Sequence, residues 1–94
     1  MKPSDRPALA KDVVAREVAG ETVLLNLATG TYFGLNEIGS LVWQWLEEAP
    51  GSTLADISQR LEQRFDVTLD QAQSDVLALA AHLAENGLLE AAAD

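Results

Sequence analysis

Few side chains in this 94-residue chain could take part in catalysis. It contains one histidine, His82, and no cysteine. A catalytic histidine needs a nucleophile or a reacting proton within reach, and the scattered serines show no spacing typical of a catalytic triad. Isolated histidines on helices are usually half-buried or solvated. The sequence therefore predicts no catalytic residue, and the protein is not expected to be an enzyme.

Metal and nucleotide sites also lack their usual patterns. The fifteen acidic residues include neighbours such as Glu47-Glu48, but they follow no calcium-loop spacing, and one histidine cannot form a histidine pair on a helix. The glycines in the segment from Gly30 to Gly34 are followed by no lysine and lack the spacing of a dinucleotide-binding loop. We therefore expect no metal ion and no cofactor.

The net charge restricts the possible partners. Six basic and fifteen acidic residues give a formal charge of −9, so the protein as a whole repels phosphate backbones and anionic membrane surfaces. No apolar run approaches the roughly 20 residues that cross a bilayer, and the N-terminus lacks the apolar segment of a signal peptide. We expect a cytoplasmic protein that binds neither nucleic acid nor membrane.

The first third of the chain has the pattern of an antiparallel sheet. β-Branched and aliphatic residues dominate the segments Val13 to Val18 and Thr22 to Leu27, with a reversal at Ala19-Gly20-Glu21 between them. After a turn at Ala28-Thr29-Gly30, a third strand is predicted over Thr31 to Leu35. The third strand has no charged residue to block the addition of another strand at its edge.

Three helices are predicted after these strands. The first begins after an N-cap at Asn36 and ends at Pro50-Gly51. The second and third begin with capping-box patterns at Thr53 and Thr68, and a glycine C-cap at Gly87 ends the third. The large side chains of the first helix exceed one apolar stripe, so this helix is expected to pack on two sides.

The order of the elements predicts the fold class. We expect an α+β protein, winged helix-turn-helix-like, with a three-stranded antiparallel sheet followed by three helices. Its domain should span residues 13–90. Residues 1–12 are expected to form a flexible N-terminal arm, and residues 91–94 a frayed tail.

Three classes of small binding protein can be compared with the pattern of such a domain. A winged-helix transcriptional regulator would have to act through protein contacts, because the third predicted helix has acidic residues but no lysine or arginine. An acyl or peptidyl carrier needs an exposed serine at a helix start, in the order Asp-Ser-Leu. Neither Asp56-Ile57-Ser58 nor Ser74-Asp75-Val76 provides it. The third class is a peptide-binding module, in which an extended peptide adds to the free edge of the third strand.

One long motif runs from the second predicted strand into the first helix: Leu24-Leu25-Asn26-Leu27-Ala28-Thr29-Gly30-Thr31-Tyr32-Phe33-Gly34-Leu35-Asn36, followed by Val42-Trp43. Further matching segments are Phe65-Asp66-Val67 and Gly87-Leu88-Leu89, so the likeness covers about Val13 to Glu90. In these segments the chain resembles the PqqD-like family. These are the RiPP recognition elements, the peptide-recognition elements of pathways that modify ribosomally synthesised peptides.

The resemblance implies a domain without catalysis of its own that binds the leader segment of a precursor peptide. It also implies delivery of the precursor to a maturation enzyme, which would be a leader peptidase, a cyclase or a radical-SAM enzyme. In the family, the leader lies as an added strand against the third strand, in a groove shared with the third helix. The peptide-binding residues carried onto this chain are Thr31, Tyr32, Phe33, Gly34, Leu35, Asp75, Val76, Leu79, His82 and Leu83.

Two details of the resemblance refine this expectation. Family members devoted to pyrroloquinoline quinone biosynthesis carry a Pro-Glu pair at the hairpin where this chain has Leu27 to Gly30, which favours a lasso peptide or a radical-SAM-modified peptide as the product. Within the third helix, Val76 and Leu83 fit the core as well as they fit a groove. The protein is expected to be a monomer or a weak homodimer.

Overall fold

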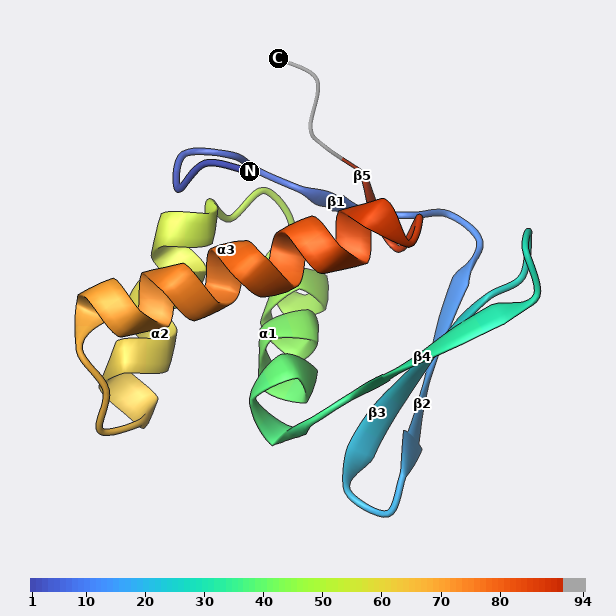
Figure 1. Cartoon of the computed structure of the whole chain (residues 1–94), viewed down its shortest axis with the longest axis horizontal. Helices are drawn as coiled ribbons and strands as arrows, with labels where there is room; N and C mark the ends of the chain where they lie inside the picture. The colour runs from blue at the N-terminus through green and yellow to red at the C-terminus, as the bar shows by residue number, and fades with distance from the viewer. Residues whose placement is uncertain (91–94) are drawn as a thin grey trace.

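The computed structural model describes residues 1–90 and places three helices at one end of the molecule and a three-stranded sheet at the other (Figure 1). The tail expected at residues 91–94 lies outside the described residues. The elements in chain order are β1 (Ala8–Leu9), β2 (Val13–Val18), β3 (Glu21–Asn26), β4 (Thr31–Leu35), α1 (Glu37–Glu48), α2 (Leu54–Arg64), α3 (Leu69–Glu85) and β5 (Leu89–Glu90). The predicted α+β class, with three antiparallel strands before three helices, is confirmed.

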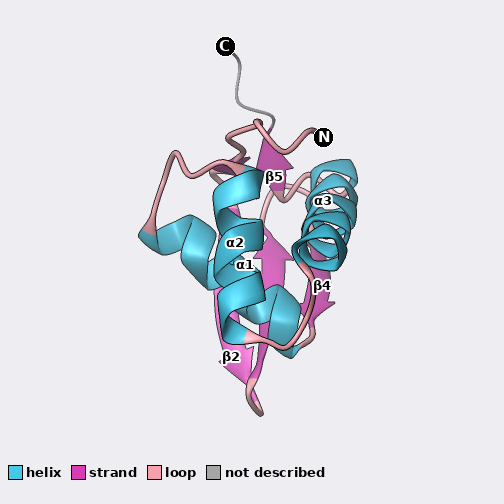
Figure 2. Cartoon of the chain, turned by 90° about the vertical axis from the view of Figure 1, so that its left-hand side faces the viewer, coloured by secondary structure: helices cyan, strands magenta, loops and turns pink. Residues whose placement is uncertain are grey.

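The sheet is an antiparallel meander in the order β2-β3-β4. A two-residue turn joins β2 to β3, since Val18 pairs with Glu21. Both turn residues have a positive φ, 53° at Ala19 and 85° at Gly20, which is the signature of a type I′ turn. This turn has the twist that a tight antiparallel hairpin requires. Figure 2 shows β4 on the same side of the molecule as α3, and β2 on the opposite side.

The helices begin at the predicted caps. Asn36 accepts a hydrogen bond from the Gly39 backbone N–H at 2.8 Å, and Thr53 forms both bonds of a capping box with Asp56. At α3, the Thr68 hydroxyl accepts from the backbone N–H of Gln71 at 3.1 Å. The Gln71 side chain instead donates to Asp75 at 2.9 Å, so the reciprocal bond of the expected box is replaced by a bond along the helix surface.

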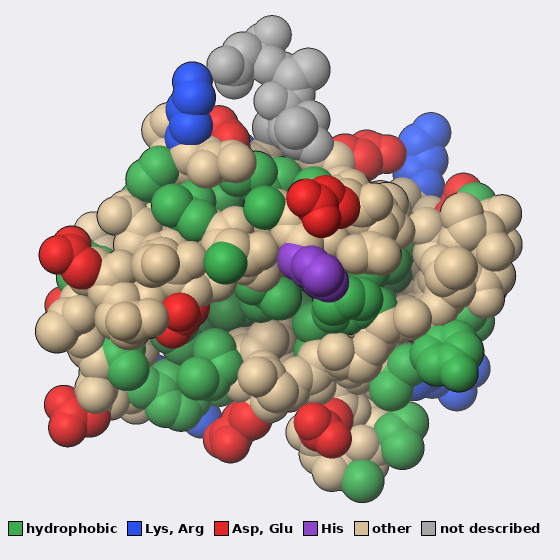
Figure 3. All heavy atoms as spheres, in the orientation of Figure 1, with side chains coloured by type: hydrophobic (Ala, Val, Ile, Leu, Met, Phe, Trp, Pro, Cys, Tyr) green, Lys and Arg blue, Asp and Glu red, His purple; other side chains and the backbone are tan. Residues whose placement is uncertain are grey.

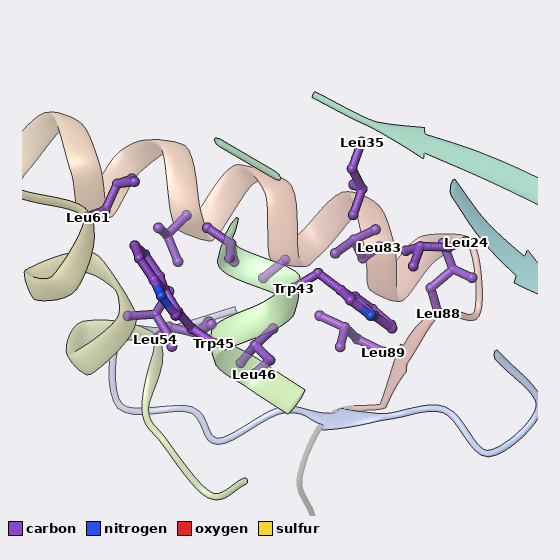
Figure 4. Close-up of a cluster of buried hydrophobic side chains, with 14 of the residues drawn as sticks. Leu24, Leu35, Trp43, Trp45, Leu46, Leu54, Leu61, Leu83, Leu88 and Leu89 are labelled. Atoms are coloured by element: carbon purple, nitrogen blue, oxygen red, sulfur yellow. The ribbon is translucent and has the colours of Figure 1, made fainter. Parts of the chain in front are cut away.

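The core is built around the two tryptophans of α1, which lie on different sides of this helix (Figure 4). Trp43 packs toward Leu83 of α3 and Leu89 of β5, and Trp45 packs toward α2, where the Arg60 guanidinium lies 4.8 Å from its ring centroid. Both indoles are buried. The expectation that α1 packs on two sides is therefore confirmed, and α1 connects the sheet, α2 and the C-terminal segment.

The N-terminal arm is attached to the domain, in contrast to the flexible arm expected over residues 1–12. β1 pairs with β5, where Leu9 lies opposite Leu89. Further back, the carbonyl groups of Pro3 and Asp5 accept hydrogen bonds from backbone N–H groups in the first turn of α2, at 2.8 and 3.0 Å. The physical reason is that the first turn of a helix has unpaired N–H groups, which the arm satisfies.

The turn at Ala19 gives a prediction for stability. A non-glycine residue pays a conformational penalty at positive φ, and asparagine tolerates this region better than alanine. Ala19→Asn should therefore raise the free energy of unfolding by about 0.5 to 1 kcal/mol. Urea denaturation followed by circular dichroism measures the change. Ala19→Val is the matched control and should be less stable than the parent protein, and equal stability of both variants would contradict the turn assignment.

Candidate functional site: an open strand edge beside a helix

The central strand β3 divides its backbone hydrogen bonds between two neighbours. The tight turn makes Val18 and Glu21 the bonded pair closest to the hairpin end. From Glu21 onward, every second residue of β3 therefore bonds β2, and the residues between them, including Leu24, bond β4. The alternation turns the backbone groups of each β3 residue toward one of the two neighbouring strands.

β4 is the edge strand and keeps part of its backbone unpaired. Phe33 lies opposite Leu24 and therefore directs its backbone N–H and C=O groups toward β3. By the same alternation, Tyr32 and Gly34 direct theirs toward the outside of the sheet. Within residues 1–90 no strand pairs with this side of β4. The sheet thus presents two donors and two acceptors in a row to an added strand.

The side chains of β4 alternate between two faces. Leu35 is buried and Phe33 half-buried on the face turned toward the helices. Tyr32 and Gly34 lie on the opposite face, and Tyr32 is 77% exposed. A strand added to this edge would direct alternate side chains toward the helices and away from them.

The helix that accompanies the edge is α3. Asp75, Leu79 and His82 follow at spacings of four and three residues and so lie on one face of α3. The His82 ring packs against Phe33 of β4, with 5.1 Å between ring centroids and an interplanar angle of 56°. Figure 3 shows the histidine against hydrophobic side chains at a shallow groove on this face. The structure therefore brings Phe33 of β4 and His82 of α3 into contact, and it places Leu79 and Asp75 on the same face of α3 as His82.

Three other predicted site residues have buried side chains. Val76 and Leu83 of α3 are fully buried, and Leu35 is 3% exposed. They are part of the hydrophobic core beneath the groove. Of the two interpretations of Val76 and Leu83, the structure favours the core, because both project from α3 on the side that faces the other elements. Leu35 contributes its backbone to the strand and its side chain to the core.

Two polar residues to which the sequence analysis gave no role connect the sheet to the helices. Asn26, at the end of β3, is 6% exposed, and its side-chain oxygen accepts from the backbone N–H groups of Ala28 and Thr29 at 3.0 and 3.4 Å. Its amide nitrogen donates to the carbonyl of Gly87, just after α3, at 3.4 Å. Asn26 therefore joins the β3–β4 turn to the C-terminal end of α3.

Ser40 performs the corresponding role at the other end of β4. Its hydroxyl accepts from the Thr22 N–H at 3.0 Å and donates to the Leu35 carbonyl at 3.4 Å. This hydroxyl bridges the last pair of β3 and β4 and joins it to α1. Two sequence signals could have identified these residues. Ser40 is a polar residue in an apolar helix segment, and Asn26 is an asparagine inside a predicted strand.

The residues of α3 beside the β4 edge are acidic or uncharged, and none of them is basic. α3 has no lysine or arginine, and its exposed Asp75 lies on the groove face.

In the described part of the chain, no three His, Cys, Asp or Glu side chains come together as metal ligands. No helix among residues 1–90 has the length and hydrophobicity to cross a membrane.

A hollow of about 400 Å³ lies elsewhere, between the β2–β3 hairpin and α1. Its charged lining residues are Arg16, Glu17, Glu37, Glu47 and Arg64. Acidic and basic groups are mixed in this lining, so it favours no ligand of one charge. An extended peptide binds along an open strand edge and not inside a cavity, so the β4 edge needs no such hollow.

The fold and the open edge together define a winged helix-turn-helix-like domain with one strand available for pairing. The chain belongs to the PqqD family: the family model described as "Coenzyme PQQ synthesis protein D (PqqD)" matches residues 21–89. This confirms the resemblance seen in the sequence. Among curated proteins, none matches the chain.

Solved structures share both the fold and part of the sequence. TbiB1 in complex with the TbiA(beta) leader peptide is 36% identical, with a TM-score of 0.83 over 93% of this chain and 99% of that one. A lasso peptide synthetase B1 complexed with its leader peptide is 29% identical, with a TM-score of 0.81 over 90% and 98% of the two chains. The PqqD truncation of Methylobacterium extorquens PqqCD, described as a stand-alone RiPP recognition element, is 28% identical, with a TM-score of 0.76 over 95% and 93%.

Asn26 allows a test of how the site is held together. Asn26→Ala leaves two backbone N–H groups and the Gly87 carbonyl without their side-chain partner, so it should lower the free energy of unfolding by about 1 to 3 kcal/mol. Chemical denaturation measures the loss. Asn86→Ala is the matched control, because it removes the side chain of an exposed asparagine whose hydrogen bond to the His82 carbonyl can be replaced by water. Asn86→Ala should therefore lose less stability than Asn26→Ala, and equal losses would show that the buried bonds of Asn26 contribute nothing beyond those of an exposed asparagine.

Proposed function

We propose that this chain binds the leader segment of a ribosomally synthesised precursor peptide as an added strand on β4 and delivers the precursor to a maturation enzyme. The observation that carries the proposal is the unpaired edge of β4 beside the groove face of α3. Two structures of the same fold, TbiB1 and lasso peptide synthetase B1, are described as complexes with leader peptides. The role assigned to the chain is recognition without a catalytic step of its own.

The edge supplies a sequence-independent part of the affinity. Four backbone groups of Tyr32 and Gly34 are available, and each hydrogen bond contributes about 1 kcal/mol net. This sum alone is too small to hold a peptide that must be ordered on binding. Apolar leader side chains buried against Phe33 and Leu79 would add roughly 1.5 to 3 kcal/mol each, which gives a Kd in the micromolar range or tighter.

The groove also indicates what the leader should carry. The half-buried Phe33 and Leu79 offer an apolar surface, and the His82 ring extends it across α3. Asp75 lies on the same helix face and is exposed, so a lysine or arginine of the leader would pair with it. We therefore propose Thr31 to Leu35 as the strand that pairs with the leader, and Asp75, Leu79 and His82 as the wall.

The similarity to lasso peptide synthetase B1 favours one class of precursor peptide. TbiB1 and the lasso synthetase protein are matched over nearly their whole lengths, and both are described with leader peptides bound. We propose a lasso-type precursor as the first substrate to test, with a leader peptidase or cyclase as the receiving enzyme and a radical-SAM enzyme as the alternative recipient. Because precursor peptides are made on ribosomes, we place the encounter in the cytoplasm.

A proline substitution tests strand addition at the edge. Gly34→Pro removes a backbone donor that faces outward and places the proline ring where the added strand would pair, so it should weaken leader binding at least tenfold while the protein stays folded. The probes are the leader of the precursor encoded beside this gene and the TbiA(beta) leader peptide. Binding is measured by titration calorimetry, and amide shifts by NMR should concentrate on Thr31 to Leu35 and on residues 75–83.

Glu17→Pro is the matched control. Glu17 lies on the other edge strand, β2, where the same alternation turns its N–H outward, and it is exposed. The control should bind the leader as tightly as the parent protein. A folded Gly34→Pro protein that binds the leader normally would refute strand addition on β4, and the absence of leader binding by the parent protein would refute the proposed function.

A further inference from the structure

On the outer face of the sheet, Gly34 leaves a gap in the row of side chains along the β4 edge, and this gap beside Tyr32 is called the notch. The register places Gly34 beside Val23 of β3, and Tyr32 beside Leu25, all on the face opposite Phe33 and Leu35. A Cβ atom built on Gly34 meets no atom within 4 Å, so the space above this residue is open. Tyr32 forms one wall of the notch and is 77% exposed.

We propose that this notch is a second recognition subsite, which holds a large aromatic or aliphatic side chain of the leader strand on the side of the sheet away from α3. This inference rests on the proposed function, because a leader strand on β4 must be present to supply the side chain. Residues directly opposite each other in paired strands project to the same face. The leader residue opposite Gly34 therefore lies over the notch.

The shape and chemistry of the notch select the occupant. Glycine offers no side chain for a neighbouring strand to pack on, and a bulky residue in the adjacent strand fills such a gap. Here the neighbours are the half-buried Val23 and the Tyr32 ring, which together give an apolar floor and wall. Glu21 occupies the diagonal position on β3 and disfavours an acidic leader residue.

The free protein has no other use for this arrangement. Gly34 has an ordinary negative φ, so the backbone does not require glycine at this position. Strands favour β-branched residues, and an exposed tyrosine next to a glycine leaves apolar surface in water. A leader side chain that covers Val23 and the Tyr32 ring removes this surface from water, and the site then reads the leader from both faces of the strand.

A valine substitution tests the notch without removing the edge. Gly34→Val keeps the backbone N–H and has room in the free protein, so the fold should remain and the notch should be filled. We expect its affinity for the unmodified leader to drop at least tenfold. The leader residue opposite Gly34 is identified in the parent complex by nuclear Overhauser contacts with Tyr32, the only tyrosine of the chain.

A compensating leader makes the test specific. When that leader residue is replaced by glycine, the parent protein should lose at least tenfold in affinity, and Gly34→Val should bind the changed leader at least as tightly as the parent protein does. Tyr32→Ala should weaken binding of the unmodified leader three- to tenfold and leave binding of the glycine leader unchanged. Val18→Ala, which truncates another exposed apolar residue on the same face of the far strand β2, is the control and should change neither.

The outcomes separate this inference from the proposed function. If the parent protein binds the leader and Gly34→Val binds it equally well, the notch is not a subsite and strand addition stands. If Gly34→Val and Tyr32→Ala weaken only the binding of the maturation enzyme, the face belongs to that enzyme and the inference is overturned. If the parent protein binds neither leader probe, both proposals fail together.

Discussion

An edge strand can recognise a peptide only if its distance from the neighbouring helix is fixed, and in this protein two hydrogen-bonded side chains fix that distance. Asn26 ties the turn before β4 to the end of α3, and Ser40 ties the far end of β4 to α1. Between these points the side chains of β4 need only alternate to give one face to the core and one to solvent. The open edge is thus held at both ends while its outward backbone groups stay unpaired.

The two tryptophans of α1 hold β4 and α3 in place through the hydrophobic core. Because Trp43 and Trp45 leave the helix on different sides, α1 packs on the C-terminal segment and on α2 at once. α3 in turn packs on α2 and ends beside the sheet, where His82 meets Phe33. The groove between β4 and α3 therefore depends on the core of the whole domain, which explains why Val76 and Leu83 matter for the site without being available to a ligand.

The sequence predicted the strands β2 to β4 and the three helices because each has a local cause, whereas β1 and β5 were not predicted. Period-two and period-3.6 patterns gave the strands and helices, and Asn36, Thr53 and Thr68 gave the helix starts. The edge at Thr31 to Leu35 was predicted for the same reason, since three consecutive strands with tight turns form a meander. Asp75, Leu79 and His82 came from the resemblance to the family together with Val76 and Leu83, and the structure separates the last two, which are buried in the core, from the others.

What the sequence did not predict depends on contacts between distant segments. An asparagine inside a predicted strand is an unusual feature, but no local pattern identifies its partner Gly87, which lies 61 positions further along the chain. The N-terminal arm has little apolar periodicity, so it was expected to be free, whereas its carbonyl groups satisfy the first turn of α2. In both cases a backbone group finds its hydrogen-bond partner in a residue far away in the sequence, which periodicity does not indicate.

The pairing of β1 with β5 has a further consequence for the path of the chain. It brings the first strand and the last described strand side by side, on the opposite side of the molecule from the β2–β3 turn (Figure 1). Ala8 lies opposite Glu90, so the path of the chain from residue 8 to residue 90 closes on itself, and the β4 edge lies within this closed path and not at one of its ends.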